Sequence, residues 1–138
     1  MSSNITTRWA SWSPQMHAIL RIVTGFLFIW PGSMKLFSYP IGMPGGMKLE
    51  LMSQVGIGGV LEFFGGILIV LGLFTRPVAF LLCGEMAVAY WQFHAPKGFL
   101  PIINGGTDAA LYCFNFLYLS SAGAGPWSVD SARRRGAA

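Results

Sequence analysis

The chain has 138 residues, of which 54% are apolar and only 10% are charged, and its formal net charge is +4. Soluble domains carry about 25% charged residues, so this balance argues against a soluble protein and indicates a single membrane domain. Three of the nine basic residues are Arg133, Arg134 and Arg135 near the end, and the others are scattered, so no nucleic-acid partner is expected.

Residues 1–14 are predicted to form a short polar tail, in which Trp9 and Trp12 favour a membrane–water interface. The first membrane span is predicted over residues 15–37, with an interruption near Pro31 and Gly32. No small-residue cleavage site follows this apolar stretch, so we expect the span itself to act as a signal anchor. The loop over residues 38–55 is rich in Gly, Pro and Met, and at most one short helical turn is expected in it.

Residues 56–74 form the second predicted span, which contains one carboxylate, Glu62. Helical spacing places Glu62 on the same face as Gly58, Gly59, Gly65 and Gly66. Small residues let another helix approach closely in lipid, and a charge on such a face points into a protein interior. The second span therefore predicts neighbouring helices that bury Glu62.

The third span is predicted over residues 76–94, with Pro77 in its first turn. A second loop, residues 95–106, precedes a fourth span at 107–122, where Thr107 is expected to cap the helix and Asp108 to lie in its first turn. The membrane domain thus covers residues 15–123, and residues 124–138 are expected to form a basic tail.

Four spans would place both termini on one side of the membrane. The predicted fold is therefore all-α, an integral membrane four-helix bundle. The basic residues on the terminal side are Arg8, Arg76 and the three tail arginines, against Lys35, Lys48 and Lys97 on the other side. The positive-inside rule then predicts that both termini face the cytoplasm.

Polar side chains inside the spans fall on one face of each helix, which predicts a shared polar axis. From the helical rise, Arg21 lies in nearly the same layer as Glu85, and its long side chain could reach toward Glu62. The candidate residues of this axis, and of a possible quinone or ligand pocket in it, are Arg21, Glu62, Glu85, Gln92, His94, Asp108, Tyr112 and Asn115.

Two interpretations of this axis follow from its charges. In the structural one, Arg21 pairs with Glu85 to fix the helix register, and Glu62 is held by hydrogen bonds or by protonation. In the functional one, two carboxylates that share one cation cannot both stay ionised without a large cost, so one of them carries a proton. Because Glu85 is expected to be the better paired, Glu62 is the predicted proton carrier, for instance beside a quinone.

Other candidate groups lie near the ends of the spans. His17 and His94 fall near opposite ends of their spans, so they cannot together bind one haem or complete a metal site within one chain. His94 is expected at the interface or as a proton access point, and Lys35 is expected to extend to the outer surface. Residues 104–108 predict a turn and a helix cap, or the mouth of a pocket.

Cys83 and Cys113 lie at similar depth in the third and fourth spans and lack CxxC spacing. Buried apolar thiols are the expected state, although a disulfide between them is geometrically conceivable.

The order of several short motifs resembles the DoxX family of small four-helix membrane proteins. These motifs are Arg21, Gly25, Gly32-x-x-Lys35-Leu36, Glu62-x-x-Gly65-Gly66, Leu71-Gly72-Leu73-x-Thr75-Arg76, Asn104-Gly105-Gly106-x-Asp108 and Gly123-x-Gly125-x-Trp127-Ser128-x-Asp130. In one respect the chain differs, because family members often carry His where Pro31 stands.

The resemblance implies a membrane oxidoreductase system, because one branch of the family resembles subunits of a thiosulfate:quinone oxidoreductase and another acts with a superoxide dismutase and a sulfurtransferase in thiol stress. It therefore implies a quinone- or thiol-linked subunit in a bacterial inner membrane, with membrane lipids and a partner subunit or a second copy as partners. The sequence shows no ligand set for haem, copper or iron–sulfur clusters, so no metal is expected. The alternative is a non-catalytic scaffold or assembly factor whose ion pairs only fix helix packing, and the absence of an internal repeat disfavours a solute carrier.

Overall fold

The computed structural model describes residues 2–47 and 49–137, and every regular element in them is helical. Four long helices form the body of the protein: α2 (Ser13–Phe37), α3 (Gln54–Leu71), α4 (Thr75–Ala89) and α6 (Thr107–Ala122). Each of the four segments expected to be helical overlaps one of them over most of its length. The prediction of an all-α chain is confirmed.

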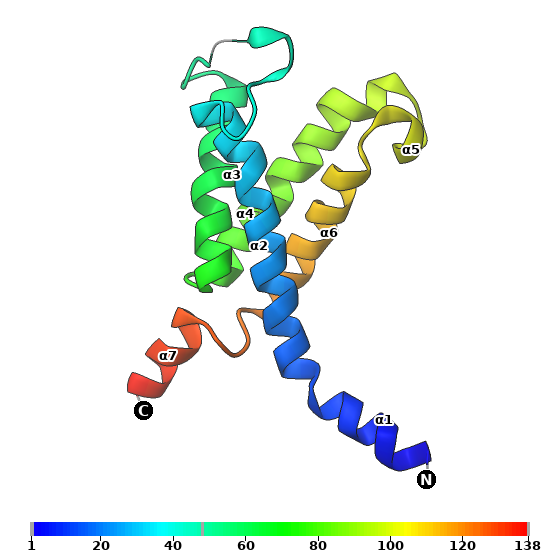
Figure 1. The fold of residues 1–138 in the computed structure, drawn as a ribbon, viewed down its shortest axis with the longest axis vertical. Coiled ribbons are helices and arrows are strands. Elements are labelled where there is room, and N and C mark those ends of the chain that lie inside the picture. Colours follow the sequence, from blue (N-terminus) through cyan, green and yellow to red (C-terminus); the bar gives the residue numbers. More distant parts are fainter. Residues whose placement is uncertain (1, 48, 138) are drawn as a thin grey trace.

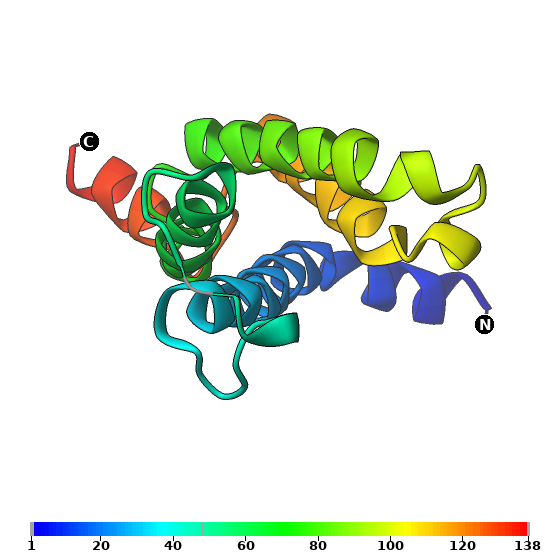
Figure 2. The same cartoon turned by 90° about the horizontal axis from the view of Figure 1, so that it is seen from above.

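The long helices form two antiparallel pairs, with α2 along α3 and α4 along α6. The pairs approach each other near the end that holds both chain termini and diverge toward the opposite end, as Figure 1 and the view from above in Figure 2 show. Both termini therefore lie at the same end of the helices.

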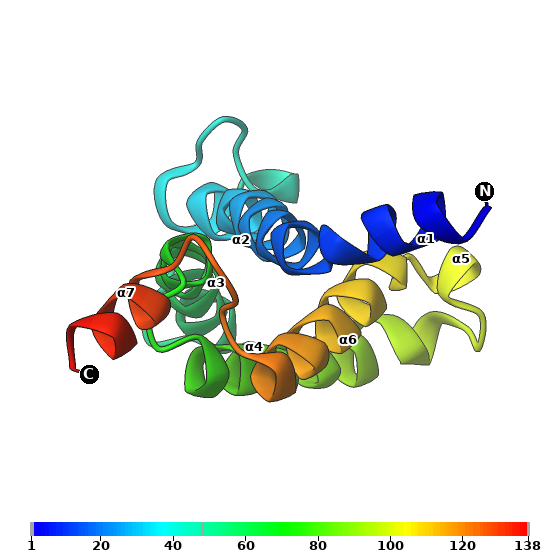
Figure 3. The ribbon, with the colours of Figure 1, turned by 90° about the horizontal axis from the view of Figure 1, so that it is seen from below.

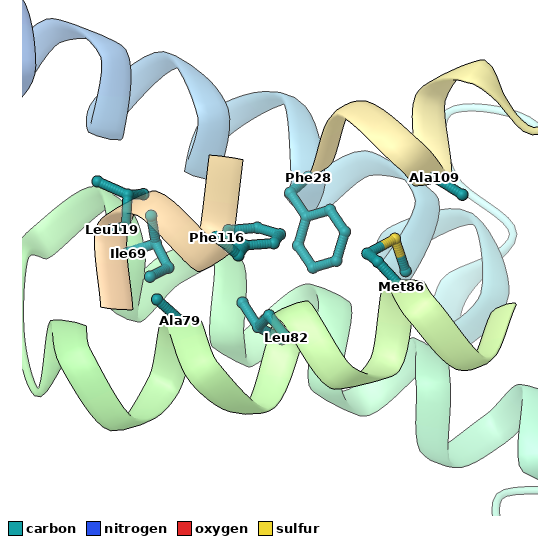
Figure 4. Close-up of a cluster of buried hydrophobic side chains, with 8 residues drawn as sticks. All are labelled: Phe28, Ile69, Ala79, Leu82, Met86, Ala109, Phe116 and Leu119. Atoms are coloured by element: carbon teal, nitrogen blue, oxygen red, sulfur yellow. The ribbon is translucent and has the colours of Figure 1, made fainter. Parts of the chain in front are cut away.

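The apolar core lies where the two pairs meet, and each long helix contributes to it (Figure 4). The Phe28 ring of α2 packs edge-on against the Phe116 ring of α6, with 4.8 Å between centroids. Ile69 of α3 and Leu82 of α4 are also fully buried there. This cluster joins the two pairs into one body.

The α2–α3 pair is unusually close because glycines face each other across it. A Cβ atom on Gly32 would lie 2.4 Å from the backbone nitrogen of Phe63, and one on Gly25 would lie 2.8 Å from the carbonyl oxygen of Gly66. Helix α2 continues through Pro31 to Phe37, so the predicted interruption is wrong. The proline removes one backbone donor, but the packing of the next residue against α3 holds the turn in place.

Helix α3 ends at Leu71, earlier than the predicted boundary at residue 74. Gly72 adopts a left-handed conformation with φ of 64°, and the next amide, that of Leu73, bonds to the Leu68 carbonyl at 3.0 Å. Glycine ends helices in this way because it lacks the Cβ that disfavours positive φ. The chain then enters α4 after only two more residues.

Both predicted tails contain helices, which were not predicted from the sequence. Helix α1 (Ser2–Ser11) precedes α2, and α7 (Val129–Gly136) follows an N-cap in which the Ser128 hydroxyl accepts the Ser131 amide at 3.1 Å. Seen from below in Figure 3, α1 and α7 extend in opposite directions, and the segment after α6 crosses the end of the α2–α3 pair.

The loop before α3 contains one 3-10 turn, Pro44–Gly46. The last residues of the predicted third span form a π-helical turn (η2, Tyr90–His94), and the predicted loop after it contains a 3-10 turn (η3, Ala95–Lys97) and the short helix α5 (Pro101–Asn104). The N-cap of α6 is Gly106 and no side chain caps it, so the predicted Thr107 cap is wrong, whereas Asp108 lies in the first turn as predicted.

By length and composition, α2 and α3 are the described helices that could cross a membrane, with mean hydropathies of 1.3 and 1.9. Helices α4 and α6 have 15 and 16 residues, fewer than the roughly 20 that a span requires. The π-helical turn η2 continues the coil of α4 as far as His94.

Candidate functional site

The centre of the candidate site is an ion pair between α2 and α3. The Lys35 ammonium, in the last turn of α2, lies 2.6 and 2.7 Å from the two carboxylate oxygens of Glu62 in α3. The Glu62 side chain is 5% exposed and that of Lys35 is 24% exposed, so the pair is shielded on the glutamate side. The expectation that Lys35 extends to the outer surface is therefore wrong.

Glu85 of α4 is the second carboxylate of the site. It interacts electrostatically with both Glu62 and Lys35. Its Oε1 atom packs against α3, since a Cβ on Gly58 would lie 3.2 Å from it. Its Oε2 atom is buried and has no hydrogen-bond partner among the residues that the structure describes. The Lys35 ammonium thus lies near two carboxylates, and both of its described hydrogen bonds go to Glu62.

Tyr112 brings α6 to the same group. Its half-buried side chain interacts electrostatically with Glu62 and with Asp108, and its ring centroid lies 4.9 Å from that of Phe28. Polar side chains from all four long helices therefore lie within electrostatic range of one another beside the apolar core: Lys35, Glu62, Glu85 and Tyr112. We call these four residues the polar cluster.

Arg21 does not belong to this cluster. Although fully buried, it lies near the terminal end, where its guanidinium donates to the backbone carbonyls of Ala124, Pro126 and Trp127. The bonds to Pro126 and Trp127 measure 3.2 and 2.7 Å. The acid that interacts with it electrostatically is Asp130. The predicted pairing of Arg21 with Glu85 is therefore wrong, because the segment after α6 folds back and supplies carbonyl acceptors that spacing along the helices cannot reveal.

The remaining predicted site residues are dispersed. Gln92 is exposed on η2 and bonds to the side chain of Gln54. His94 is half-buried, and its Nδ1 atom lies 3.1 Å from the Asn104 carbonyl oxygen. Asp108 is exposed at the start of α6, and Asn115 lies half-buried in the middle of that helix. None of these four contacts the Lys35–Glu62 pair in the hydrogen bonds described.

Asn104 organises the loop before α6. Its side-chain oxygen accepts the Gly106 amide at 2.7 Å, and its amide nitrogen donates to the Gly98 carbonyl at 2.8 Å and to the Tyr90 hydroxyl at 3.3 Å. The residues 104–108 thus form the predicted turn, with Asn104 itself buried as its centre.

Two hollows stand out on the molecule, and neither is lined by the polar cluster. One, of 210 Å³, lies at the start of α4 and is bounded by Thr75, Arg76, Asp130 and Arg134 among others. The other, of 440 Å³, lies along α1 beside Trp9 and Trp12. Within the described residues, no three His, Cys, Asp or Glu side chains gather as a metal site would require.

Cys83 and Cys113 face each other across the α4–α6 interface, with 3.7 Å between their sulfur atoms. Both are free thiols, half-buried at the edge of the apolar core. The similar depth expected for them is thus accompanied by direct contact.

Comparison with known proteins identifies the family of this chain. A family model described as DoxX matches residues 16–95, more than half of the sequence. The chain belongs to the DoxX family. It is 46% identical over 121 residues to a protein of Haemophilus influenzae named "Uncharacterized protein", and the match covers 86% of this chain and 90% of that relative. No solved structure matches the chain significantly.

The part of this DoxX chain that the family model matches includes three of the four members of the polar cluster, namely Lys35, Glu62 and Glu85. Sequence reasoning missed the role of Lys35, although a signal was present. Lys35 lies on the same helical face as Phe28 and Gly32, which continues the face of Arg21. A residue that continues a packed face points into the interface, whatever its charge.

Proposed function

We propose that this DoxX-family chain is a multi-pass membrane protein, with α2, α3, α4 continued by η2, and α6 all within the bilayer. The support is the apolar surface that these helices leave uncovered, since soluble monomers rarely expose large contiguous apolar patches. Its members include Val23, Phe26 and Leu27 of α2, Phe64 and Leu71 of α3, Phe80, Leu81 and Val88 of α4, and Phe114 and Leu117 of α6.

The proposed orientation places the terminal end in the cytoplasm of a bacterial inner membrane. Arg8, Arg76 and the three arginines of α7 belong to that end, and Lys97 belongs to the loops at the other. Basic residues are enriched on the cytoplasmic side of membrane proteins. Lys48, which was expected at the outer end, lies outside the described residues.

Its proposed function is that of a small subunit in a quinone- or thiol-linked oxidoreductase system, with a partner subunit or a second copy of the chain beside it. The observation that carries this proposal is the unequal sharing of Lys35 between two carboxylates. Glu62 holds the ammonium through both oxygens, whereas Glu85 has a buried oxygen that bonds to none of the described residues. Glu85 is therefore the proposed proton carrier, in place of Glu62.

The polar cluster has the donors that a quinone headgroup would use. A quinone takes up two electrons and two protons at its two carbonyl oxygens. The Lys35 ammonium has three N–H donors, and Glu62 uses two of them. The third, together with a protonated Glu85 carboxyl, can donate to such oxygens. The electrons for this reduction would come from thiols or from a partner subunit, and in the reverse direction a hydroquinone would supply them.

A scaffold without redox chemistry is the second candidate function. The direct pairing of Lys35 with Glu62 favours it, because a buried ion pair between closely packed helices can specify their register alone. The two candidates differ in what they require of Glu85. The scaffold needs only its bulk, whereas the oxidoreductase subunit needs its proton.

Infrared difference spectroscopy of the chain in lipid vesicles separates the two functions. Ubiquinone-1 is reduced electrochemically in the vesicles, and the carboxyl stretching region is recorded for wild type and for Glu85→Gln, Glu62→Gln and Glu50→Gln. The proposal predicts a protonated-carboxyl signal that is lost in Glu85→Gln alone, with Glu50→Gln as the exposed control. A spectrum without that signal, or with one that survives in Glu85→Gln, favours the scaffold.

A further inference from the structure

The thiols of Cys83 and Cys113 form a second chemical feature of the chain, separate from the polar cluster. They come from α4 and α6, thirty residues apart in sequence, and their sulfur atoms lie 3.7 Å from each other. A disulfide has an S–S length near 2.05 Å, so the sulfurs need to approach by about 1.7 Å. Rotation about the two Cα–Cβ bonds moves sulfur atoms over such distances without moving a helix backbone.

The surroundings of the pair leave it accessible from the apolar surface of the molecule. Both cysteines are half-buried, on the rim of the core and not within it. Phe80, one turn before Cys83, is 70% exposed, and Phe114, next to Cys113, is 68% exposed. Gly84 follows Cys83, and a side chain there would meet nothing within 4 Å. The helices therefore present no bulky cover beside the thiols at Gly84.

We infer that Cys83 and Cys113 form a redox-active dithiol that a lipid-soluble two-electron acceptor of the quinone class oxidises to an interhelical disulfide. In this reaction the two S–H bonds break and one S–S bond forms. The two electrons and two protons pass to the carbonyl oxygens of the quinone, which becomes a hydroquinone. The reverse reaction reduces the disulfide at the expense of a hydroquinone. The inference rests on the proposed membrane location, because a quinone reaches the pair from lipid.

Oxidation would connect α4 to α6 within one pair of helices and leave the α2–α3 pair unchanged. The thiols lie across an interface that the core residues Leu82 and Phe116 already hold closed. A disulfide there adds a covalent bond to an existing contact, so we expect little change in helix content on oxidation. The chain can therefore cycle between the two states without unfolding.

The test uses the full chain, reduced under anaerobic conditions and reconstituted in phospholipid vesicles. Ubiquinone-1 is the probe, because its fully substituted ring offers no free position for thiol addition. Free thiols are counted by maleimide–polyethylene glycol gel shift, the cross-link is located by mass spectrometry, and hydroquinone is followed by ultraviolet absorbance. Diamide, a direct thiol oxidant, serves as the second oxidant, and resistance to alkaline extraction checks that the protein lies in the membrane.

The expected result is loss of both maleimide-reactive thiols, a Cys83–Cys113 cross-link within one chain, and about one hydroquinone per chain. Cys83→Ser and Cys113→Ser should each abolish the cross-link and the hydroquinone. A cross-link with diamide but not with ubiquinone-1, or with neither oxidant, overturns the inference. A cross-linked dimer in an equal mixture of the two variants also overturns it, because the thiols of separate chains then meet.

Failure of this inference is distinguishable from failure of the proposed function. A chain that resists alkaline extraction but keeps its thiols overturns the dithiol alone. A chain that alkali removes from the vesicles overturns the membrane location, and with it both proposals.

Discussion

Lys35 and Glu62 pair across the glycine-lined interface of α2 and α3, with the ammonium nitrogen 2.6 and 2.7 Å from the two carboxylate oxygens. We expect Lys35→Met to lower the free energy of unfolding by about 3 kcal/mol, because it leaves Glu62 buried without its cation. The double variant Lys35→Met with Glu62→Gln should recover most of that loss. Denaturation in mixed detergent micelles measures both.

Lys97→Met is the matched control, since Lys97 is exposed in the loop region. It should leave the unfolding free energy within about 0.5 kcal/mol of wild type. Equal stabilities for wild type and Lys35→Met would show that the pair contributes nothing.

Gly32→Ala is expected to destabilise the α2–α3 pair by about 1–3 kcal/mol. A Cβ at this position would overlap the backbone of Phe63 and Gly59, which cannot move without separating the helices. Gly84→Ala tests the same substitution in open space, and there alanine should be neutral or slightly stabilising, because it favours the helix. Thermal unfolding followed by circular dichroism compares the two, and a larger loss for Gly84→Ala would contradict the packing described.

Arg21→Lys should release the segment that joins α6 to α7. The guanidinium reaches three carbonyls on a curved segment, and the single ammonium of lysine cannot reproduce that fork. We expect amide hydrogen exchange over residues 124–131 to become at least about tenfold faster, which corresponds to a loss of roughly 1.4 kcal/mol. Exchange within α3 should not change. Protection equal to wild type over residues 124–131 would rule out the bracing role.

Asp130 makes the docking of α7 dependent on pH. Burial by itself would raise the pKa of Asp130, but amide hydrogen bonds from Thr75 and Phe74, each of 2.9 Å, and the charge of Arg133 lower that pKa below its ordinary value. A lowered folded-state pKa stabilises the docked state fully above about pH 4 and loses this contribution as the pH falls through the folded-state value.

We therefore expect hydrogen exchange over residues 129–136, corrected for its intrinsic pH dependence, to show weaker protection in acid than near neutral pH. Asp130→Asn should be less protected near neutral pH and should lack the acid-dependent step, since the amide cannot titrate. The same acid-dependent step in both proteins would assign it to another group.

Much of the architecture could be predicted from local sequence. The apolar runs, the glycine face around Glu62, and the turn and loop residues between the runs predict helices close to where α2, α3, α4 and α6 occur. These features act within one or two turns of a helix, so a single sequence contains the information for them. The helices of the two tails were not predicted, because α1 and α7 are short and carry no sustained apolar periodicity.

Partners across helices could not be predicted in the same way. The depth estimated from the helical rise placed Arg21 in the layer of Glu85. Depth alone does not determine which neighbouring helix a side chain faces. The return of residues 124–130 over the terminal end gave Arg21 its carbonyl acceptors. The continuation of α2 beyond Pro31 carried Lys35 to Glu62 and left Glu85 as the carboxylate with an unpartnered oxygen.

The sequence by itself determined that this protein is helical, that charged residues are enclosed among apolar helices, and that carboxylates outnumber the cation between them. The tertiary structure alone decided which cation that is, which carboxylate lacks a partner, and that two thiols touch. Helix formation depends on neighbours along the chain, whereas these pairings depend on the packing angle and rotation of whole helices, which every contact in the core sets together.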